Sequence, residues 1–372
     1  MNISNETKVI AVIFLVWFGL LMTVGFVART ESLYTGAKCT VKNQLPYYRW
    51  DSFWYTSIAR HGYSFSHDTN SSIAFFPLYP AIIRVTHDVT GIKEDRVSFG
   101  LNILFSLLIV VFLYRLARLD YTEDVTRNII LAVLFFPPAY FFLSGYPDAL
   151  FVLLTLLSLY FGRCGYWWRA GFFAALLALT KPYGIFMVPA LLFEYLAQHE
   201  WQWRVLWREK NWWPLLLPLL TFGGFIVFNW LSFHEPLAFL IAQDTWGRAL
   251  GQPLLSLFRE ARYFLSDTVW SGGHAPYLVY LGSFFFALVA GFLAWQRVRR
   301  SYVVFSLLIL GSALLTGTLT SFGRYTLLGL ALIMGVAVSL SPRKKIFWTY
   351  IFFSALLLLA TANLFVRCYP FE

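Results

Sequence analysis

The chain has 372 residues, of which 59% are hydrophobic and only 13% are charged. Soluble domains carry about 45–50% apolar and about 25% charged residues, so this composition excludes an ordinary soluble domain. The apolar runs have helix length, and they lack the alternation of a membrane barrel. We therefore predict an all-α polytopic membrane protein.

The formal net charge is +10, which could suggest a nucleic-acid binder. The basic residues do not form one soluble block, however, but occupy short loops between apolar runs. This distribution follows the positive-inside rule of membrane proteins. The sequence thus predicts that the chain is embedded in membrane lipid and does not bind nucleic acid.

We predict about eleven transmembrane helices, within a range of about nine to thirteen. The first run, Val9 to Ala28, is too long for a signal-peptide core and is expected to be a retained anchor. Residues 1–372 are expected to form a single membrane domain. The predicted spans are 9–28, 97–117, 126–144, 148–162, 166–180, 182–198, 212–233, 276–296, 302–319, 325–340 and 346–366.

With the N-terminus inside, the basic residues separate onto one side of the membrane. The short outer connections then hold few cations besides Lys181 and Arg324. Two long loops, 29–96 and 234–275, share the outer side. The inner loops hold Arg115, Arg118, Arg127, Arg163, Arg169, Arg204, Arg208, Lys210, Arg297, Arg299, Arg300, Arg343, Lys344 and Lys345.

The first outer loop is predicted to be structured. Residues 50–61 suit a helix lying in the membrane interface, with Asp51 and Tyr55 one turn apart on its flank. A second element follows Phe75 to Pro80, where the prolines suit a helix start. We expect this loop to form a folded cap over the membrane.

Asp51 is the first candidate for chemistry, in the sequence Arg49-Trp50-Asp51. It could be only an N-terminal helix residue favoured by the helix dipole, paired with Arg49. Alternatively, a single carboxylate among aromatic residues at the lipid–water boundary could act as a general base on a hydroxyl group. The surrounding motif favours the general base.

Asp148 follows Tyr146-Pro147, where an outer turn re-enters the membrane. An acid at the start of an apolar helix can be an N-cap. Two functional alternatives stay open: Asp148 could orient an acceptor molecule, or it could pair with a cation of the site.

Lys181, in Thr180-Lys181-Pro182, and Arg324, in Gly323-Arg324-Tyr325, interrupt apolar stretches on the outer side. A charge deep in lipid costs about 2.5–3.5 kcal/mol on insertion scales, so such residues usually have a function. Lys181 could instead extend its amine to the interface, and Arg324 could pair with an acid. Both are also suited to bind phosphate.

The second outer loop contains Trp246-Gly247-Arg248. Trp246 could stack on a sugar ring and Arg248 could bind phosphate, while an ordinary interfacial helix is the equal alternative. No metal site is expected, because His61, His67, His87 and His274 have no ligand spacing. Phosphate-binding loops, dinucleotide fingerprints and Ser-His-Asp patterns are also missing.

The three cysteines, Cys39, Cys164 and Cys368, are too few for a metal site or a disulfide framework. Cys39 and Cys368 share the predicted outer side. A disulfide between them is geometrically possible, but the sequence does not determine whether they meet.

Together these motifs resemble the PIG-V family of mannosyltransferases, which are polytopic GT-C glycosyltransferases. The resemblance extends in order over most of the chain. It rests on Arg49-Trp50-Asp51 through Gly62-Tyr63, Ala74 to Pro80, Tyr146-Pro147-Asp148 with Leu150-Phe151, Thr180-Lys181-Pro182 with Gly184, Trp246-Gly247-Arg248, and Arg324-Tyr325.

The resemblance implies transfer of a sugar, mannose in this family, from a polyprenyl-phosphate donor to a hydroxyl acceptor by an inverting mechanism. Asp51 would be the base. Arg324, Lys181 and Arg248 would bind the donor phosphate. The residues expected to contact the acceptor or the sugar are Asp148, Trp50, Tyr55 and Trp246. The acceptor would be a glycolipid or a glycan, and no cofactor or metal is expected.

Three positions depart from the family pattern. Asp148 stands where glutamate is usual, and Lys181 stands where arginine is common. Gly323 precedes Arg324 where histidine is common. Each change preserves the charge of the motif but could alter the acceptor.

Two other functions remain open. One is a GT-C enzyme that uses another lipid-linked sugar or a protein acceptor. The other is a lipid or glycan transporter, although transporters usually place polar groups near the midplane of repeated halves. The chain looks shorter than eukaryotic members of the family. This favours a prokaryotic plasma membrane over the endoplasmic reticulum, with the active site on the outer face.

Overall fold

The computed structural model describes residues 5–28, 45–247, 251, 257, 258, 262, 275–316 and 319–369. Within these residues, regular structure consists of α-helices and short 3-10 helices, without strands. The all-α prediction is therefore confirmed.

The first half of the chain carries the elements of the predicted cap and the central helices. Their bounds are α1 Asn5–Ala28, α2 Ser52–His61, η1 Ser72–Ala74, α3 Leu78–Thr90, α4 Glu94–Ala117, α5 Glu123–Leu134, η2 Pro137–Phe142, α6 Asp148–Arg163 and α7 Trp167–Ala178.

The second half continues with further helices of varied length. Their bounds are η3 Pro182–Phe186, α8 Met187–Gln198, α9 Val205–Arg208, η4 Trp213–Leu216, α10 Leu217–Phe233, α11 Ala238–Thr245, α13 Ala275–Arg297, α14 Arg300–Leu314, α15 Phe322–Leu328, α16 Leu330–Leu340 and α17 Lys344–Val366.

Five helices among the described residues are long and apolar enough to cross a membrane, and a sixth span arises if α15 and α16 count together. Those two helices meet at a bend of 75°. The protein is thus an integral multi-pass membrane protein. The predicted number of about eleven spans is not confirmed, because several of the other apolar helices have only 12–16 residues.

Prolines explain where the predicted spans are broken. The predicted span 126–144 is divided into α5 and η2, and η2 begins with Pro137. The predicted span 182–198 likewise begins as the 3-10 helix η3 at Pro182 before α8 continues. Proline lacks a backbone N–H and suits only the first turn of a helix.

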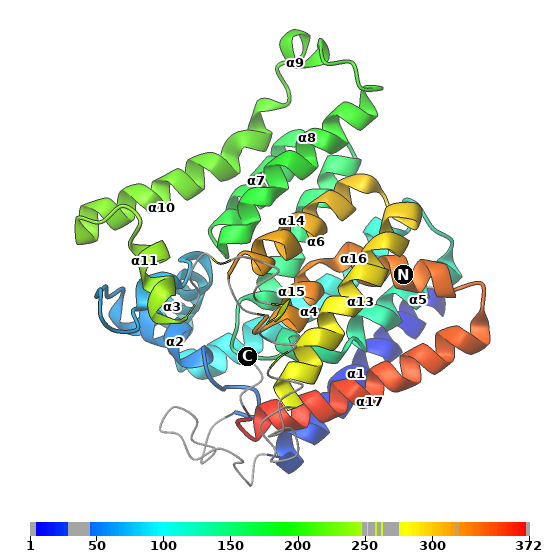
Figure 1. The fold of residues 1–372 in the computed structure, drawn as a ribbon, viewed down its shortest axis with the longest axis horizontal. Coiled ribbons are helices and arrows are strands. Elements are labelled where there is room, and N and C mark those ends of the chain that lie inside the picture. The colour runs from blue at the N-terminus through cyan, green and yellow to red at the C-terminus, as the bar shows by residue number, and fades with distance from the viewer. Residues whose placement is uncertain are drawn as a thin grey trace.

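Helix α6 lies at the centre of the bundle, where it contacts α4, α7 and α8. Both of its ends carry a charge, Asp148 at the first residue and Arg163 at the last. With 16 residues at 1.5 Å each, those ends lie about 24 Å apart. In Figure 1, α1 and α17 lie side by side along one edge of the bundle, and α9 marks the end beyond α8.

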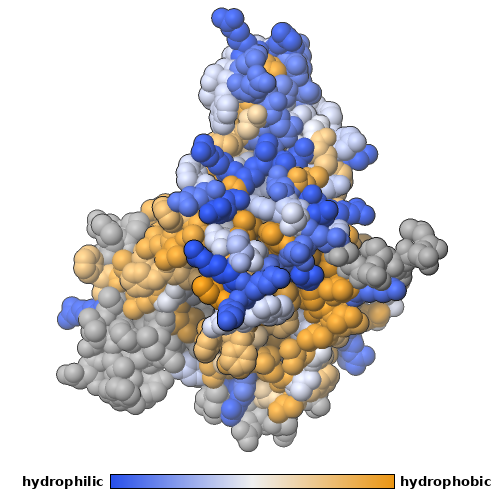
Figure 2. All heavy atoms as spheres, turned by 90° about the vertical axis from the view of Figure 1, so that its right-hand side faces the viewer, coloured by the Kyte–Doolittle hydropathy of each residue, from blue (hydrophilic) through white to orange (hydrophobic). Residues whose placement is uncertain are grey.

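The surface differs between the two regions of the molecule. In Figure 2, hydrophobic side chains gather over the lower part of the face shown, whereas hydrophilic ones cover its upper end. A broad apolar surface of this kind suits contact with lipid.

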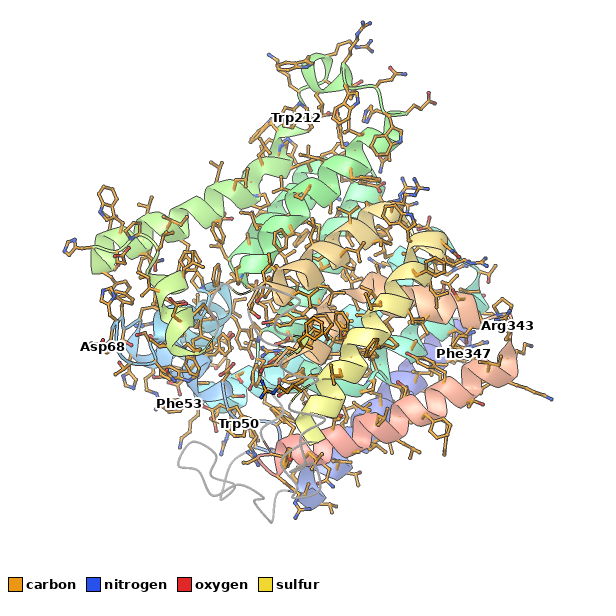
Figure 3. The ribbon with its side chains drawn as sticks, in the orientation of Figure 1. Trp50, Phe53, Asp68, Trp212, Arg343 and Phe347 are labelled. Atoms are coloured by element: carbon orange, nitrogen blue, oxygen red, sulfur yellow. The ribbon has the colours of Figure 1, made fainter. Side chains whose placement is uncertain are left out.

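The predicted cap is present as helices α2 and α3. Helix α2 buries Tyr55 and Ile58 against the bundle and leaves Phe53 exposed. Figure 3 places Trp50 and Phe53 together near the start of α2, far from Trp212 at the opposite end of the molecule. Arg60 fixes the other end of α2, because its guanidinium binds both carboxylate oxygens of Glu94 at 2.9 and 2.6 Å.

Helix α11 and the end of α10 close over this cap. Ala238, Phe239 and Ala242 of α11 form a small core with Phe76 and Phe225. The side-chain amide of Gln243 also donates to the carbonyl of Ala74 at 3.2 Å. These contacts join two segments that are about 170 residues apart in the chain.

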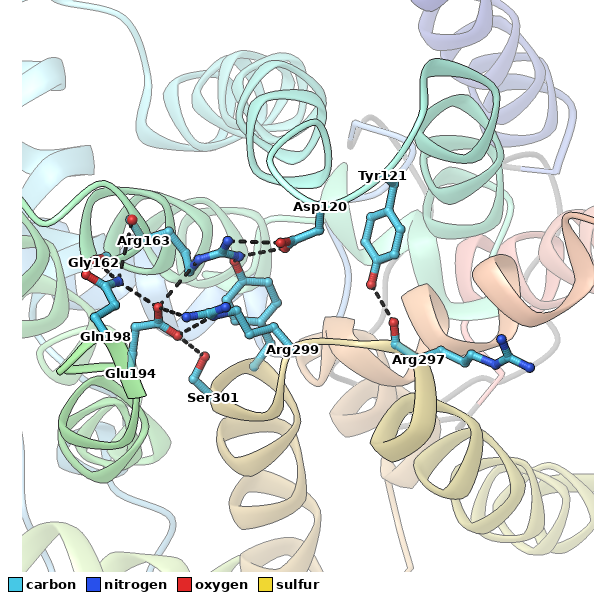
Figure 4. A network of polar contacts seen from close by, with 10 residues as sticks. Asp120, Tyr121, Gly162, Arg163, Glu194, Gln198, Arg297, Arg299 and Ser301 are labelled. Carbon is cyan, nitrogen blue, oxygen red and sulfur yellow. Dashed lines mark hydrogen bonds and ion pairs between the residues drawn. The ribbon is translucent and has the colours of Figure 1, made fainter. Parts of the chain in front are cut away.

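A polar network joins loops that the sequence places together on the inner side (Figure 4). Glu194 is nearly fully buried and binds the guanidinium of Arg299 at 2.7 and 2.8 Å. Ser301 donates to the same carboxylate at 2.7 Å. Arg163 binds Asp120 at 2.6 and 2.9 Å, which connects the end of α6 to the α4–α5 loop. These contacts agree with the predicted alternation of loops.

Candidate active site

A cavity of about 1020 Å³ lies where the cap, α11 and the α14–α15 region meet. Small-molecule sites usually enclose about 300–1,000 Å³, so the space suffices for a sugar and part of a lipid chain. Among the described residues, its charged lining consists of Asp51, Lys181, Glu235, Asp244 and Arg324. Apolar and aromatic residues line much of the rest, including Phe75, Phe76, Ile185, Phe186, Phe222, Ile226, Leu240, Ile241 and Leu315.

Both cations among the described lining residues, Lys181 and Arg324, are held by one buried acid. Asp148 has 0% exposure, and its carboxylate accepts two bonds from Arg324, at 2.8 Å from Nε and 2.7 Å from Nη2. Lys181 Nζ lies 3.2 Å from the same carboxylate. Two positive charges and one negative charge leave this group with one net positive charge at the cavity wall.

Local sequence explains how Lys181 reaches the cavity. The residue has an extended backbone directly before η3, and Pro182 begins that 3-10 helix. Gly184 allows η3 to pack on α7, because a Cβ at this position would overlap the carbonyl group of Leu177. The glycine of this motif is therefore required by close backbone contact.

Arg324 lies in the first turn of the short helix α15. Its guanidinium stacks on the ring of Tyr146, with 4.4 Å from Cζ to the ring centroid, and on Phe141 at 5.0 Å. Aromatic faces attract a guanidinium electrostatically. The two rings and Asp148 thus orient Arg324 while part of it still faces the cavity.

Asp51 borders the same cavity, directly before α2. Its backbone N–H donates to the hydroxyl of Tyr146 at 3.1 Å. The alternative partner, Arg49, is buried and donates to the carbonyls of Leu45, Tyr48 and Val366 at 3.0, 2.8 and 2.9 Å. Arg49 thus has a structural role in connecting the cap to the end of α17.

Aromatic residues form the wall around Asp51. Tyr55 and Trp246, both expected from the sequence, line the cavity. Trp246 makes edge contacts with Trp54 at 5.4 Å and with Phe75 at 5.7 Å between ring centroids. Burial raises the pKa of Tyr55 well above its usual value. Its phenol therefore stays protonated and is unsuited to act as a base.

Trp50, which was expected at the site, is not among the described residues that line this cavity. Trp50 lies directly before Asp51 and packs partly buried against the bundle. Arg248 lies outside the described residues. Asp148 does not line the cavity either but lies behind it, which matches the alternative that it pairs with site cations.

The structure adds residues that were not singled out from the sequence. Tyr183 and Tyr325 line the cavity, and their hydroxyl groups lie 3.0 Å apart. Both follow the cations closely in sequence, so their position next to Lys181 and Arg324 was the available signal. Glu235 and Gln243 also line the cavity, but no pattern in the sequence marked them.

The described part of the chain contains no group of three or more His, Cys, Asp and Glu side chains suited to hold a metal ion. The expectation of no cofactor stays a prediction. Cys368 is disulfide-bonded and Cys164 is a free thiol. Cys39, the third cysteine of the chain, lies outside the described residues.

Comparison with known proteins finds similarity to mannosyltransferases over part of the chain. Residues 74–231 match the family model of dolichyl-phosphate-mannose-protein mannosyltransferases. Mouse GPI alpha-1,6-mannosyltransferase 2 is 32% identical over 156 residues, and the rat protein is 33% identical over 156 residues. The predicted resemblance to PIG-V mannosyltransferases is confirmed. Each match covers 39% of this chain and 30% of the relative, so the chain matches less than a third of the relatives' length.

Solved structures show the same fold at low sequence identity. ArnT from Cupriavidus metallidurans, bound to undecaprenyl phosphate, has a TM-score of 0.52 and 14% identity, and the match covers 96% of this chain and 76% of ArnT. The Archaeoglobus fulgidus oligosaccharyltransferase has a TM-score of 0.50 and 12% identity, with 94% of this chain and 53% of that protein covered. The fold is therefore of the GT-C type.

Proposed function

We propose that this protein is a glycosyltransferase that moves a sugar, mannose, from a polyprenyl-phosphate donor to a hydroxyl group of a glycolipid or glycan. The resemblance to mannosyltransferases supports the sugar and the reaction class. The observation that carries the proposal is the placement of Asp51 on the same cavity as the Lys181–Arg324 pair. A base and an anion site on one cavity are what this transfer requires.

The donor phosphate would bind at Lys181 and Arg324. The donor is a phosphodiester with one negative charge, and the cations with Asp148 offer one net positive charge. Arginine suits phosphate because its planar group donates several hydrogen bonds. The apolar lining residues Ile185, Phe186 and Leu315 would contact the first part of the polyprenyl chain.

Asp51 would act on the acceptor. It removes the proton from the acceptor hydroxyl as that oxygen attacks the anomeric carbon. The bond between the anomeric carbon and the phosphate oxygen breaks, and its electron pair stays on the phosphate. Because attack and departure occur on opposite faces, the anomeric configuration inverts.

The cations would contribute most as the bond breaks. The leaving polyprenyl phosphate is a monoester with one more negative charge than the donor. Lys181 and Arg324 are already fixed by Asp148, so they stabilise the developing charge without reorganising. Stabilisation of the transition state by preorganised charges is usually the largest single contribution to catalysis.

A transfer assay with purified protein tests the proposal. Labelled polyprenyl-phosphate mannose and the glucose counterpart are supplied separately, with an extract of native membrane lipids as acceptor. We expect labelled glycolipid from the mannose donor. Product from the glucose donor alone would overturn mannose as the sugar. If neither donor gives product and neither donor binds, the proposed glycosyltransferase activity is wrong.

We also propose that the cavity opens on the outer face of a prokaryotic plasma membrane. The predicted charge distribution supports the outer side, because Lys181 and Arg324 lie at the end of the bundle opposite the basic inner loops. Labelling a cysteine introduced at exposed Asp68 with an impermeant reagent in intact cells tests this orientation. Labelling only after lysis would contradict it.

A further inference from the structure

A single turn, residues 144–148, connects the two halves of the candidate active site. It lies between η2 and α6 and ends in Asp148, which holds the cations. Two residues earlier, Tyr146 contacts the segment that carries Asp51. The relative position of base and cations therefore depends on this turn.

Tyr146 makes two contacts of different kinds. Its hydroxyl oxygen accepts the backbone N–H of Asp51 at 3.1 Å. Its ring lies against the guanidinium of Arg324, at 4.4 Å from Cζ to the ring centroid. The side chain is fully buried, so no solvent competes for these contacts.

The backbone of the turn is fixed from the side of α4. The amide Nδ2 of Asn102 donates to the carbonyls of Ser144 and Tyr146, the latter at 2.9 Å. Ser144 also donates its hydroxyl to the carbonyl of Phe141 at 2.8 Å. Tyr146 therefore projects from a turn that is itself held on a transmembrane helix.

Gly145 sets how closely the turn approaches α2. A Cβ at Gly145 would lie 2.7 Å from both Cβ and Oγ of Ser52, the first residue of α2. A real Cβ essentially never comes this close to another heavy atom that is not bonded to it, so a side chain here would push α2 and the adjacent Asp51 away from the turn.

We propose that Tyr146 is a positioning residue, whose hydroxyl sets the place of Asp51 relative to the Lys181–Arg324 phosphate site. This inference rests on the proposed function. Through its hydroxyl the tyrosine holds the backbone that bears the base. A displacement of about 1 Å at a reacting group can reduce a rate by about a hundredfold, so a weakened anchor has a measurable effect.

Tyr146→Phe tests the hydroxyl alone, because the ring under Arg324 remains. We expect kcat to fall about tenfold, the change typical of losing one hydrogen bond of about 1 kcal/mol or slightly more. The KM and Kd for the donor should change less than twofold. Unchanged kcat, or a fall in donor affinity as large as the fall in kcat, would overturn the proposal.

Two further variants separate positioning from general damage. Tyr195→Phe removes a hydroxyl that donates to Asn211 at 2.6 Å near the end of α8, and it should leave kcat unchanged. Tyr146→Leu removes ring and hydroxyl together, and it should weaken donor binding as well as lower kcat. A Tyr195→Phe variant as slow as Tyr146→Phe would show a nonspecific effect and overturn the proposal.

Hydrogen exchange provides a readout that needs no activity. A peptide covering residues 49–55 should contain one amide that exchanges faster in Tyr146→Phe than in the wild type. Equal exchange rates of this peptide in the two proteins would show that the Tyr146 hydroxyl does not protect the Asp51 amide. If wild-type protein neither binds the donor nor transfers sugar, the proposed function fails, and the exchange result still decides whether Tyr146 fixes Asp51.

Discussion

Asp148 and Arg324 form a two-bond pair that is buried beside the cavity, with 2.8 Å between Oδ1 and Nε and 2.7 Å between Oδ2 and Nη2. The residues are 176 positions apart in the chain. Helix α6 thereby holds α15 in place, and the pair gives Arg324 one orientation. Lys181 joins the same carboxylate, so one acid determines the position of both cations.

Asp148→Asn should remove both stability and activity. Removing one partner of a buried ion pair lowers the free energy of unfolding by about 3–5 kcal/mol, because a buried charge remains without its counterion. Asp148→Glu keeps the charge and adds one methylene, which costs about 1–3 kcal/mol in a packed interior. Thermal unfolding and transfer rates measure both variants.

Asp88→Asn is the matched control for this prediction. Asp88 forms an exposed pair with Arg84 at 3.7 Å, and such pairs contribute about 0–1 kcal/mol. Equal stability and activity of Asp148→Asn and Asp88→Asn would contradict the assigned role of Asp148.

Arg324→Ala should weaken donor binding more than acceptor binding. Arg324→Lys keeps the charge but loses the planar two-bond geometry, so its donor affinity should lie between those of wild type and Arg324→Ala. Lys181→Ala should have a smaller effect, because its bond to Asp148 is a single one of 3.2 Å. Titration with polyprenyl phosphate and, separately, acceptor extract measures the difference. An equal or larger loss on the acceptor side would place Arg324 elsewhere in the mechanism.

Trp246→Ala should reduce affinity for the sugar and leave the lipid phosphate unaffected. The expected loss is about two- to tenfold for polyprenyl-phosphate mannose, the range that corresponds to about 0.5–1.5 kcal/mol for an aromatic contact. Polyprenyl phosphate without sugar should bind unchanged. Trp207→Ala, at a residue with 87% exposure far from the cavity, is the control. Equal losses for both ligands would exclude a sugar contact.

Glu194→Gln should destabilise the protein without changing donor affinity. The substitution removes the charge that holds Arg299, at a cost of about 3 kcal/mol for a buried pair. The network is attached at the Arg163 end of α6, opposite Asp148, so the phosphate site should keep its geometry. Thermal unfolding and donor titration test this. Asp124→Asn, at a side chain with 80% exposure, should leave both values unchanged. A large loss of donor affinity in Glu194→Gln would show coupling between the two ends.

The sequence singled out three of the charged residues that line the cavity, but not how the cations among them pair. Lys181 and Arg324 stood out because cations are costly in apolar segments, and both line one cavity with Asp51. That Asp148 binds both depends on contacts across 33 and 176 residues, which no local pattern encodes. The role of Tyr146 has the same origin, because its partner Asp51 is 95 residues away.

The fold was predicted in class and less well in detail. Long apolar runs correctly indicated α1, α4, α13 and α17. The shorter runs were harder, because prolines and the 75° bend after Leu328 divide them into helices that differ from the predicted spans. Glu194 was also missed, although an acid within an apolar run is itself a sign of a buried partner.

The most direct test of the account compares Asp51→Asn with wild type in one preparation, measuring donor binding and sugar transfer together. Asparagine keeps the shape of the side chain but accepts no proton. We predict that Asp51→Asn binds polyprenyl-phosphate mannose with wild-type affinity and transfers none, while the exposed control Asp68→Asn transfers normally. Wild-type transfer by Asp51→Asn would contradict the assignment of Asp51 as the base.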